Sequence, residues 1–141
     1  MTDSHGEFDA IFAELARRAR PGRFEPNVDV ALSADDETIL VTVEIAGAEP
    51  AELRIMVEER HLYILGRRVD RERTGRGTLL MKEIDYGEFG KKIHLPVPVA
   101  YEDATAHYRD GMLTISLPVS RDALLPRHRT EIRMTVRRIH A

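Results

Sequence analysis

The chain has 141 residues, with 21 basic and 24 acidic side chains, a net charge of −3, and no cysteine or tryptophan. This length fits one domain with a hydrophobic core of its own, and the lack of cysteine excludes disulfide bonds, thiolate zinc sites and a cysteine nucleophile. The longest mainly apolar stretch, residues 38–48, is far shorter than the roughly 20 residues of a membrane span. The acidic N-terminus is unlike a secretory signal. We therefore expect a cytoplasmic protein with no membrane partner.

Residues 1–27 form the first of three regions and predict an N-terminal arm with a short amphipathic helix. Its apolar residues recur at helical spacing, at Phe8, Ile11, Phe12 and Leu15. Pro21 and Gly22 end this pattern. A helix of about three turns is marginal by itself in water. The apolar stripe is therefore expected to dock on the chain's own sandwich, on another subunit or on another protein.

Residues 28–118 form the second region and predict a domain of short β-strands. Apolar residues alternate with other residues at 28–32, 39–45, 53–57 and 93–97, as expected for strands with one face buried. The charged, glycine-containing stretch 66–77 predicts a long loop, and a short apolar run follows it. Asp110 and Gly111 favour a tight hairpin turn, in which both residues have positive φ. The predicted fold is all-β, an immunoglobulin-like antiparallel β-sandwich.

Residues 119–141 form the third region, which we expect to be a flexible C-terminal extension. It is basic, with six arginines against Asp122 and Glu131. A basic tail on an acidic body either keeps the protein in solution or binds nucleic acid. The low aromatic content argues against a single-strand nucleic-acid site, so nucleic acid is not expected as a partner. Within this tail an alternating pattern is typical of a segment ready to form a strand, with apolar residues at Ile132, Met134 and Val136.

No set of residues in the sequence is typical of an active site. None of the four serines lies in the Gly-x-Ser-x-Gly frame of a hydrolase nucleophile, and residues 75–78 lack the ending of a phosphate-binding loop. None of the six histidines pairs with another at a two- or four-residue spacing. A metal site would need His94 and His107 to meet across strands. We expect no enzyme activity, no cofactor and no metal.

The hairpin region carries a resemblance to a known family. Residues 106–113 resemble the signature Ala-x-x-x-Asn-Gly-x-Leu of the small heat-shock protein (alpha-crystallin) family, with Asp110 in place of the usual Asn. Further segments match the family in the same order, at 28–30, 43–47, 62–68, 86–89 and 93–96. The resemblance covers about residues 28–118. It implies a chaperone that works without ATP, a holdase that binds unfolding proteins and prevents their aggregation during stress.

The resemblance also implies self-association, with a dimer as the building block of a higher homo-oligomer. Family dimers commonly exchange a strand from a loop between two sandwich strands. Here that loop spans about 67–80, and its apolar end is formed by Leu79, Leu80 and Met81. The alternative is an ordinary hairpin without exchange. Lys91 stands where the family often has an arginine tied to charge pairing in the dimer, and a lysine cannot make a two-pronged contact with a carboxylate.

The family's tail normally carries an anchor, Ile-x-Ile or Ile-x-Val, that docks on a neighbouring subunit. Two candidates overlap in this chain, Ile132 with Met134 and Met134 with Val136. Such a segment adds a strand to an exposed sheet edge of the neighbour, so that backbone hydrogen bonds give affinity and side-chain pockets give register. The receiving groove is expected to be lined from two strands, by Ile55, Val57, Ala106 and Tyr108.

In the implied mechanism, the N-terminal stripe and the uncovered groove bind apolar patches of unfolding proteins. Many weak contacts on one oligomer then act together. A second interpretation of the stripe is packing within the assembly itself. Two other functions stay open on the sequence alone. One is a monomeric co-chaperone of the CS type, an adaptor for a single partner, and the other is a nucleic-acid-binding sandwich that uses the basic tail.

Overall fold

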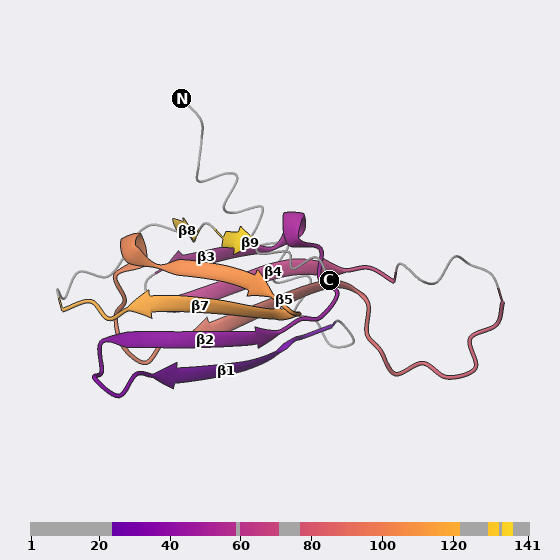
Figure 1. Cartoon of the computed structure of the whole chain (residues 1–141), viewed down its shortest axis with the longest axis horizontal. Helices are drawn as coiled ribbons and strands as arrows, with labels where there is room; N and C mark the ends of the chain where they lie inside the picture. Colours follow the sequence, from indigo (N-terminus) through magenta and orange to yellow (C-terminus); the bar gives the residue numbers. More distant parts are fainter. Residues whose placement is uncertain (1–23, 59, 71–76, 122–129, 133, 137–141) are drawn as a thin grey trace, which may run out of the picture.

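Two β-sheets pack against each other in the structure (Figure 1). The computed structural model describes residues 24–58, 60–70, 77–121, 130–132 and 134–136. Within these ranges, one sheet has the strand order β1-β2-β7-β6-β9 and the other has the order β5-β4-β3-β8. Neighbouring strands are antiparallel except for β6 and β9, which run parallel. The elements are β1 (Asn27–Leu32), β2 (Thr38–Glu44), η1 (Pro50–Glu52), β3 (Arg54–Glu58), β4 (His61–Arg68), β5 (Gly87–His94), η2 (Tyr101–Asp103), β6 (Thr105–Arg109), β7 (Met112–Pro118), β8 (Thr130–Ile132) and β9 (Met134–Val136).

This arrangement confirms the predicted all-β sandwich. The helix predicted for the N-terminal arm lies outside the described residues, as do its apolar positions Phe8, Ile11, Phe12 and Leu15. In the part of the chain that the structure describes, no helix has the length and apolar character needed to cross a membrane.

The core lies between the two sheets, because alternate residues of each inner strand point inward. In β2, Ile39, Val41 and Val43 are fully buried. They lie opposite Leu117, Ile115 and Leu113 of β7, which are equally buried. The other sheet contributes a matching layer to the same cluster, formed by Ile55, Val57, Leu62, Ile64, Phe89 and Ile93.

The strand β1 differs from the inner strands because it forms an open edge of its sheet. Its register with β2 runs from Asn27 opposite Glu44 to Leu32 opposite Ile39. Yet Val30 and Leu32 stay largely exposed, in spite of their apolar alternation. The outer edge of β1 pairs with no strand among the described residues, so its backbone groups are open to another strand.

Gly66 lies inside a strand, although the sequence predicted that the long loop begins there. The strand β4 continues to Arg68, and Gly66 is the cross-strand partner of Phe89. A Cβ on Gly66 would lie 2.3 Å from Cζ of Phe89 and 2.8 Å from Cδ2 of Leu53. Glycine is therefore needed at this position so that the buried ring of Phe89 can pack against the strand. From the sequence alone, Gly66 was predicted to be a loop residue.

The strand predicted around 93–97 is in fact β5, which begins at Gly87 and ends at His94. The first half of β5 was not predicted from the sequence, because Gly90, Lys91 and Lys92 interrupt the apolar alternation. An edge strand tolerates such residues, since one of its sides faces solvent. Leu95 is fully buried just after the strand, so the apolar pattern continues beyond the strand itself.

The hairpin between β6 and β7 has the predicted turn. Asp110 has φ 53° and Gly111 has φ 78°, the positive values that a two-residue turn of this kind requires. The turn lies against the end of β2, where the N–H of Ile45 donates to the carbonyl oxygen of Gly111 at 2.9 Å. A Cβ on Gly111 would lie 3.0 Å from Ala46, so glycine suits both the backbone conformation and the close approach.

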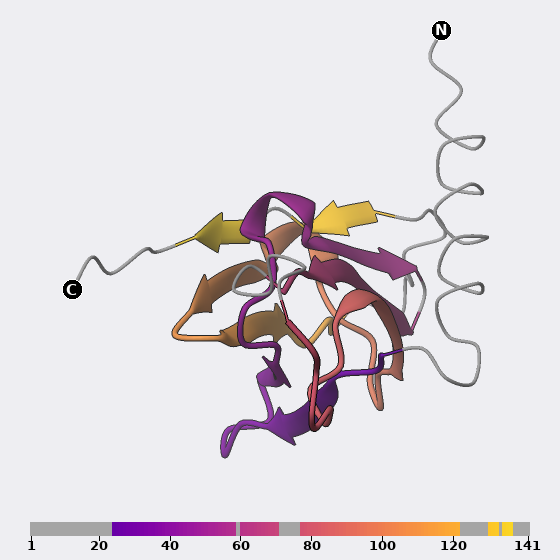
Figure 2. The ribbon, with the colours of Figure 1, turned by 90° about the vertical axis from the view of Figure 1, so that its right-hand side faces the viewer.

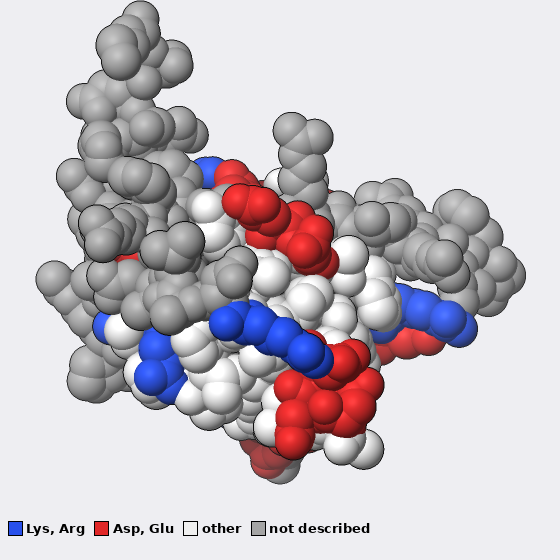
Figure 3. All heavy atoms as spheres, turned by 90° about the vertical axis from the view of Figure 1, so that its left-hand side faces the viewer, with Lys and Arg blue, Asp and Glu red and all other residues white. Residues whose placement is uncertain are grey.

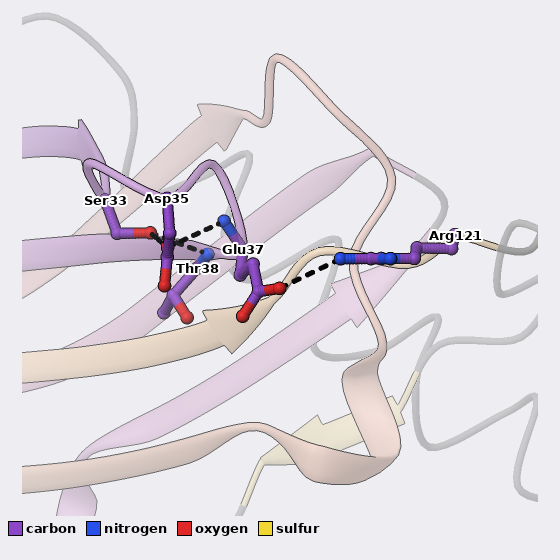
Figure 4. A network of polar contacts seen from close by, with 5 residues as sticks. All are labelled: Ser33, Asp35, Glu37, Thr38 and Arg121. Carbon is purple, nitrogen blue, oxygen red and sulfur yellow. Dashed lines mark hydrogen bonds and ion pairs between the residues drawn. The ribbon is translucent and has the colours of Figure 1, made fainter.

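A polar network fixes the turn between β1 and β2 (Figure 4). The hydroxyl of Ser33 donates to Oδ1 of Asp35 at 2.5 Å, and the N–H of Glu37 donates to the same oxygen at 3.0 Å. The pKa of Asp35 lies below its ordinary value because of these two bonds, with the Ser33 bond as the larger cause. Arg121 ties the turn to the chain after β7 through Oε1 of Glu37, at 2.9 Å.

Candidate functional site

The tail strands β8 and β9 cover one edge of each sheet. Figure 2 shows them, in yellow, along the top of the sandwich. The strand β8 pairs with β3, with Ile132 opposite Ile55 and Thr130 opposite Val57. The strand β9 pairs with β6, with Met134 opposite Ala106 and Val136 opposite Tyr108. We call these two covered edges the docking edges. They hold the four residues of the predicted groove: Ile55, Val57, Ala106 and Tyr108.

Among the three predicted anchor residues, Ile132 is the one whose burial is described. It is only 5% exposed and belongs to the core cluster, beside the cross-strand partner Ile55. For Met134 and Val136 the structure gives the backbone pairing, and their side chains lie outside the description. The pairing is within one chain, whereas the sequence predicted docking on a neighbouring subunit. Docking on a neighbour therefore stays a prediction.

An ion pair flanks the β8 side of the docking edges. Nε and Nη2 of Arg54 donate to the two carboxylate oxygens of Glu131 at 3.0 and 2.9 Å. Both side chains are more than a third exposed, and such pairs contribute at most about 1 kcal/mol. The two-pronged geometry therefore helps to fix register more than it adds affinity. The sequence gives no signal for a contact between residues so far apart.

Tyr108 fixes the β6 side of the docking edges. Its hydroxyl donates to the carbonyl oxygen of Ile45 at 2.7 Å in a buried position. Burial raises the pKa of Tyr108 above its ordinary value, which favours the protonated phenol that donates this bond. Ala106 on the same strand is 3% exposed. Both residues therefore belong to the core on the strand that pairs with β9.

The segment between β4 and β5 leaves the sandwich as a long excursion (Figure 1). Its described parts, 69–70 and 77–86, contain no strand. Its predicted apolar end is exposed, by 46% at Leu79, 94% at Leu80 and 75% at Met81. These three consecutive side chains form an exposed apolar surface on one loop.

The base of this excursion is held by Arg68. Its Nε donates to the carbonyl oxygen of Asp85 at 2.8 Å, and its guanidinium carbon lies 4.0 Å from the centre of the Phe24 ring. The anchored base therefore directs the apolar tip away from the body of the sandwich.

Lys91 has a partner within its own chain. Its Nζ lies 3.0 Å from Oε1 of Glu25, so the lysine ties β5 to the segment before β1. The resemblance implied a different role for Lys91, the pairing of charges between two subunits, and that role stays a proposal.

His94 and His107, the pair that a metal site would have needed, do not meet across strands. His94 lies in β5 and His107 in β6, which belong to different sheets. Instead, His94 lies opposite His61 of β4. The described residues hold no group of three or more His, Cys, Asp or Glu side chains in position to bind a metal ion.

Charges of both signs are mixed on the face drawn in Figure 3, where Lys and Arg atoms lie near Asp and Glu atoms with uncharged surface between them. Nucleic-acid binders concentrate basic side chains on one face. On this face, the residues that the structure describes do not form such a basic surface.

Fold and docking edges together define a two-sheet sandwich whose edges take up a strand-forming segment of a C-terminal tail. Residues 31–136 match the model of the Hsp20/alpha crystallin family, and the chain belongs to this family. It is 27% identical over 100 residues to heat shock protein 16 of Schizosaccharomyces pombe, covering 70% of this chain and 68% of that protein. It is 29% identical over 130 residues to the alpha-crystallin of Mycobacterium tuberculosis, covering 91% of this chain and 76% of that protein.

A solved structure supports the same fold. Heat shock protein 16.0 from Schizosaccharomyces pombe superimposes with a TM-score of 0.66 at 22% identity, covering 83% of this chain and 86% of that one. Membership of the small heat-shock proteins supports a chaperone function in general terms.

Proposed function

We propose that the protein is an ATP-independent holdase that binds unfolding proteins and prevents their aggregation. The observation that carries this proposal is the cover of the docking edges by two strands of three residues each. When the tail leaves, the sheet edges at β3 and β6 lose their pairing, and Ile55 and Ala106 lose their cover. Unfolding proteins display unpaired strands and apolar surface, which are complementary to such edges.

The cover is weak enough to be reversible. A net backbone hydrogen bond contributes about 0.5–1.5 kcal/mol, and burial of one isoleucine contributes about 1.5–3 kcal/mol. The entropy of ordering the tail opposes both contributions. Because these opposing contributions are of similar size, heat can release the tail, and no nucleotide is needed to drive an equilibrium of this kind.

The proposed homo-oligomer would be held together at the same docking edges. In a homo-oligomer, the tail of one subunit would dock on the edges of the next, with Ile132 as its main anchor. The same contacts then form between chains instead of within one, as in domain swapping. The pairing within one chain also favours a second candidate, a monomeric adaptor of the CS type, whose tail would close its own edges. The molecular mass in solution distinguishes the two.

The dimer would use the excursion between β4 and β5. The exposed side chains Leu79, Leu80 and Met81 are proposed to lie against the open edge of β1 in a second copy, where Val30 and Leu32 are exposed. This contact covers apolar surface and an unpaired strand edge at once. Deleting residues 70–78 is expected to give monomers, because the shortened segment can no longer reach a second copy. Replacing Leu80 and Met81 with serine is expected to do the same, because each lost side chain removes about 1.5–3 kcal/mol of burial.

Multi-angle light scattering measures this effect, with Glu83→Ser as the control that changes the same loop and leaves its apolar tip intact. An unchanged mass in both loop variants would rule out the exchange.

Thermal aggregation of a model client tests the proposed function. We expect near-stoichiometric amounts of the full chain to suppress the turbidity of a heated client equally with and without ATP. Dependence on ATP, or no suppression at any ratio, would contradict the holdase.

A variant lacking residues 1–22 tests the stripe of Phe8, Ile11, Phe12 and Leu15 in the same assay. Intact protection by that variant would limit the stripe to assembly and leave the docking edges as the client surface.

A further inference from the structure

Two histidines face each other across the strands β4 and β5, at the end of the sheet near the turn between β3 and β4. His61 and His94 are directly opposed in the register. Nδ1 of His94 lies 3.4 Å from Nε2 of His61, and the ring centres are 5.1 Å apart. Both rings lie on the outer face of the sheet, since their neighbours Leu62 and Ile93 point into the core. His94 is exposed and His61 is partly exposed, so an ion from solvent can reach them.

The separation of the two nitrogens fits a shared metal ion. Imidazole nitrogens bind Zn²⁺ at about 2.0–2.1 Å, and tetrahedral geometry then places two such nitrogens about 3.4 Å apart. The pair therefore has the spacing of two ligands of one ion, and binding requires no movement of the strands. Without an ion, one imidazole N–H can donate to the other nitrogen at this distance, in a direction that the tautomers set.

The backbone around the pair is held firmly. The N–H of Leu95 donates to the carbonyl oxygen of Arg60 at 2.6 Å. The guanidinium of Arg60 also donates two hydrogen bonds to the same segment. Nε donates to the carbonyl oxygen of Leu95 at 3.1 Å, and Nη2 donates to the carbonyl oxygen of Pro96. These bonds tie the start of β4 to the end of β5 beside both imidazoles, so the two ligands are preorganised.

We propose that His61 and His94 form a two-imidazole site for a divalent transition-metal ion of the class that imidazole prefers, with Zn²⁺ as its first representative. The described residues hold no third ligand already in position, so water completes the coordination. Glu58 lies opposite His61 in the register of β3 and β4, which puts its side chain on the same face. A site with two protein ligands releases its ion readily, in contrast to a closed structural zinc site with four.

Calorimetric titration of the full chain with zinc chloride tests the site. His61→Ala and His94→Ala are each expected to lose one bound zinc ion per chain relative to the parent protein. His107→Ala is the matched control, because this exposed histidine lies in the other sheet, and it should keep that ion. His5, His128 and His140 lie outside the described residues, so the comparison uses the difference between variants. Equal zinc stoichiometry and affinity in the parent and in both site variants would overturn the proposal.

A second measurement does not depend on substitutions. Diethyl pyrocarbonate modifies accessible histidines, and mass spectrometry locates the modified residues. Zinc is expected to protect His61 and His94 together and to leave His107 reactive. Modification of His61 and His94 at the same rate with and without zinc would contradict the site. The same experiment with Cu²⁺ is expected to give protection at lower metal concentration, as the general order of metal affinities predicts.

Discussion

Replacing Ile132, Met134 and Val136 together with alanine is expected to break the higher assembly into smaller species. Ile132 is 5% exposed and packs with the core beside Ile55, and truncation of such a buried isoleucine costs about 2–5 kcal/mol. That loss is comparable to or larger than the roughly 1.5–3 kcal/mol that burial of one isoleucine contributes to docking. Multi-angle light scattering at constant protein concentration is the measurement.

The matched control for the tail is Glu131→Gln. Glu131 lies in the same strand as Ile132 and contacts Arg54 through a solvent-exposed ion pair, so its substitution should change the free energy of docking by no more than about 1 kcal/mol. Its assembly is expected to stay intact. An unaltered mass in the triple variant would show that the tail does not hold subunits together, and would leave it as a cover of its own sandwich.

Substituting Gly66 with alanine is expected to lower the thermal stability of the whole domain. The new Cβ would lie 2.3 Å from Cζ of Phe89, and the ring has no free space because it is fully buried. Overpacking of this kind costs about 1–3 kcal/mol, which corresponds to a fall of roughly 3–15 °C in Tm. Differential scanning calorimetry at one protein concentration measures it.

A double-mutant cycle identifies the cause of that loss. Phe89→Leu shortens the side chain that the Cβ would meet, so Gly66→Ala should cost less in this background than in the parent, by 0.5 kcal/mol or more. Equal costs in the two backgrounds would locate the effect elsewhere, for example at Leu53. A Tm of Gly66→Ala equal to that of the parent would contradict the packing role of the glycine.

The parts of the fold that the sequence predicted are those where burial sets a simple period. In β2, Ile39, Val41 and Val43 alternate with outward-facing residues, and both faces have the environment that the pattern indicates. The hairpin at Asp110 was equally predictable, because few residues accept positive φ at both turn positions. Local rules sufficed for both elements.

The sequence failed where a distant contact decides a local structure. Gly66 has the composition of a loop, yet its position is set by Phe89 on the neighbouring strand. The first half of β5 lacks apolar alternation because β5 is an edge strand. In β1, Val30 and Leu32 alternate as buried residues do, but they are exposed because β1 is also an edge strand. The opposition of His61 and His94 depends on a register between strands separated by the long excursion, and no spacing in the sequence reveals it.

The residues of the candidate site were proposed from the resemblance to the family, and their role in docking stays a prediction. Alternation alone marked the tail as strand-forming, and the resemblance proposed Ile55, Val57, Ala106 and Tyr108 as its receptor. It did not indicate which strand each part of the tail would join. The structure adds that Ile132 reaches β3 while the segment from Met134 reaches β6, so one short stretch spans the edges of both sheets. Whether the receiving edges belong to the same chain or to a neighbour is a property of the assembly.

The capture of a heated client without nucleotide tests the central claim most directly. The full chain and a model client are heated together in buffer free of ATP, and the mixture is separated by size-exclusion chromatography with multi-angle light scattering. The holdase account predicts a soluble complex of high mass that contains both proteins, and less of this complex as the amount of the chain is reduced. A chain that elutes alone as a monomer while the client precipitates would contradict the account and favour an adaptor for one specific partner.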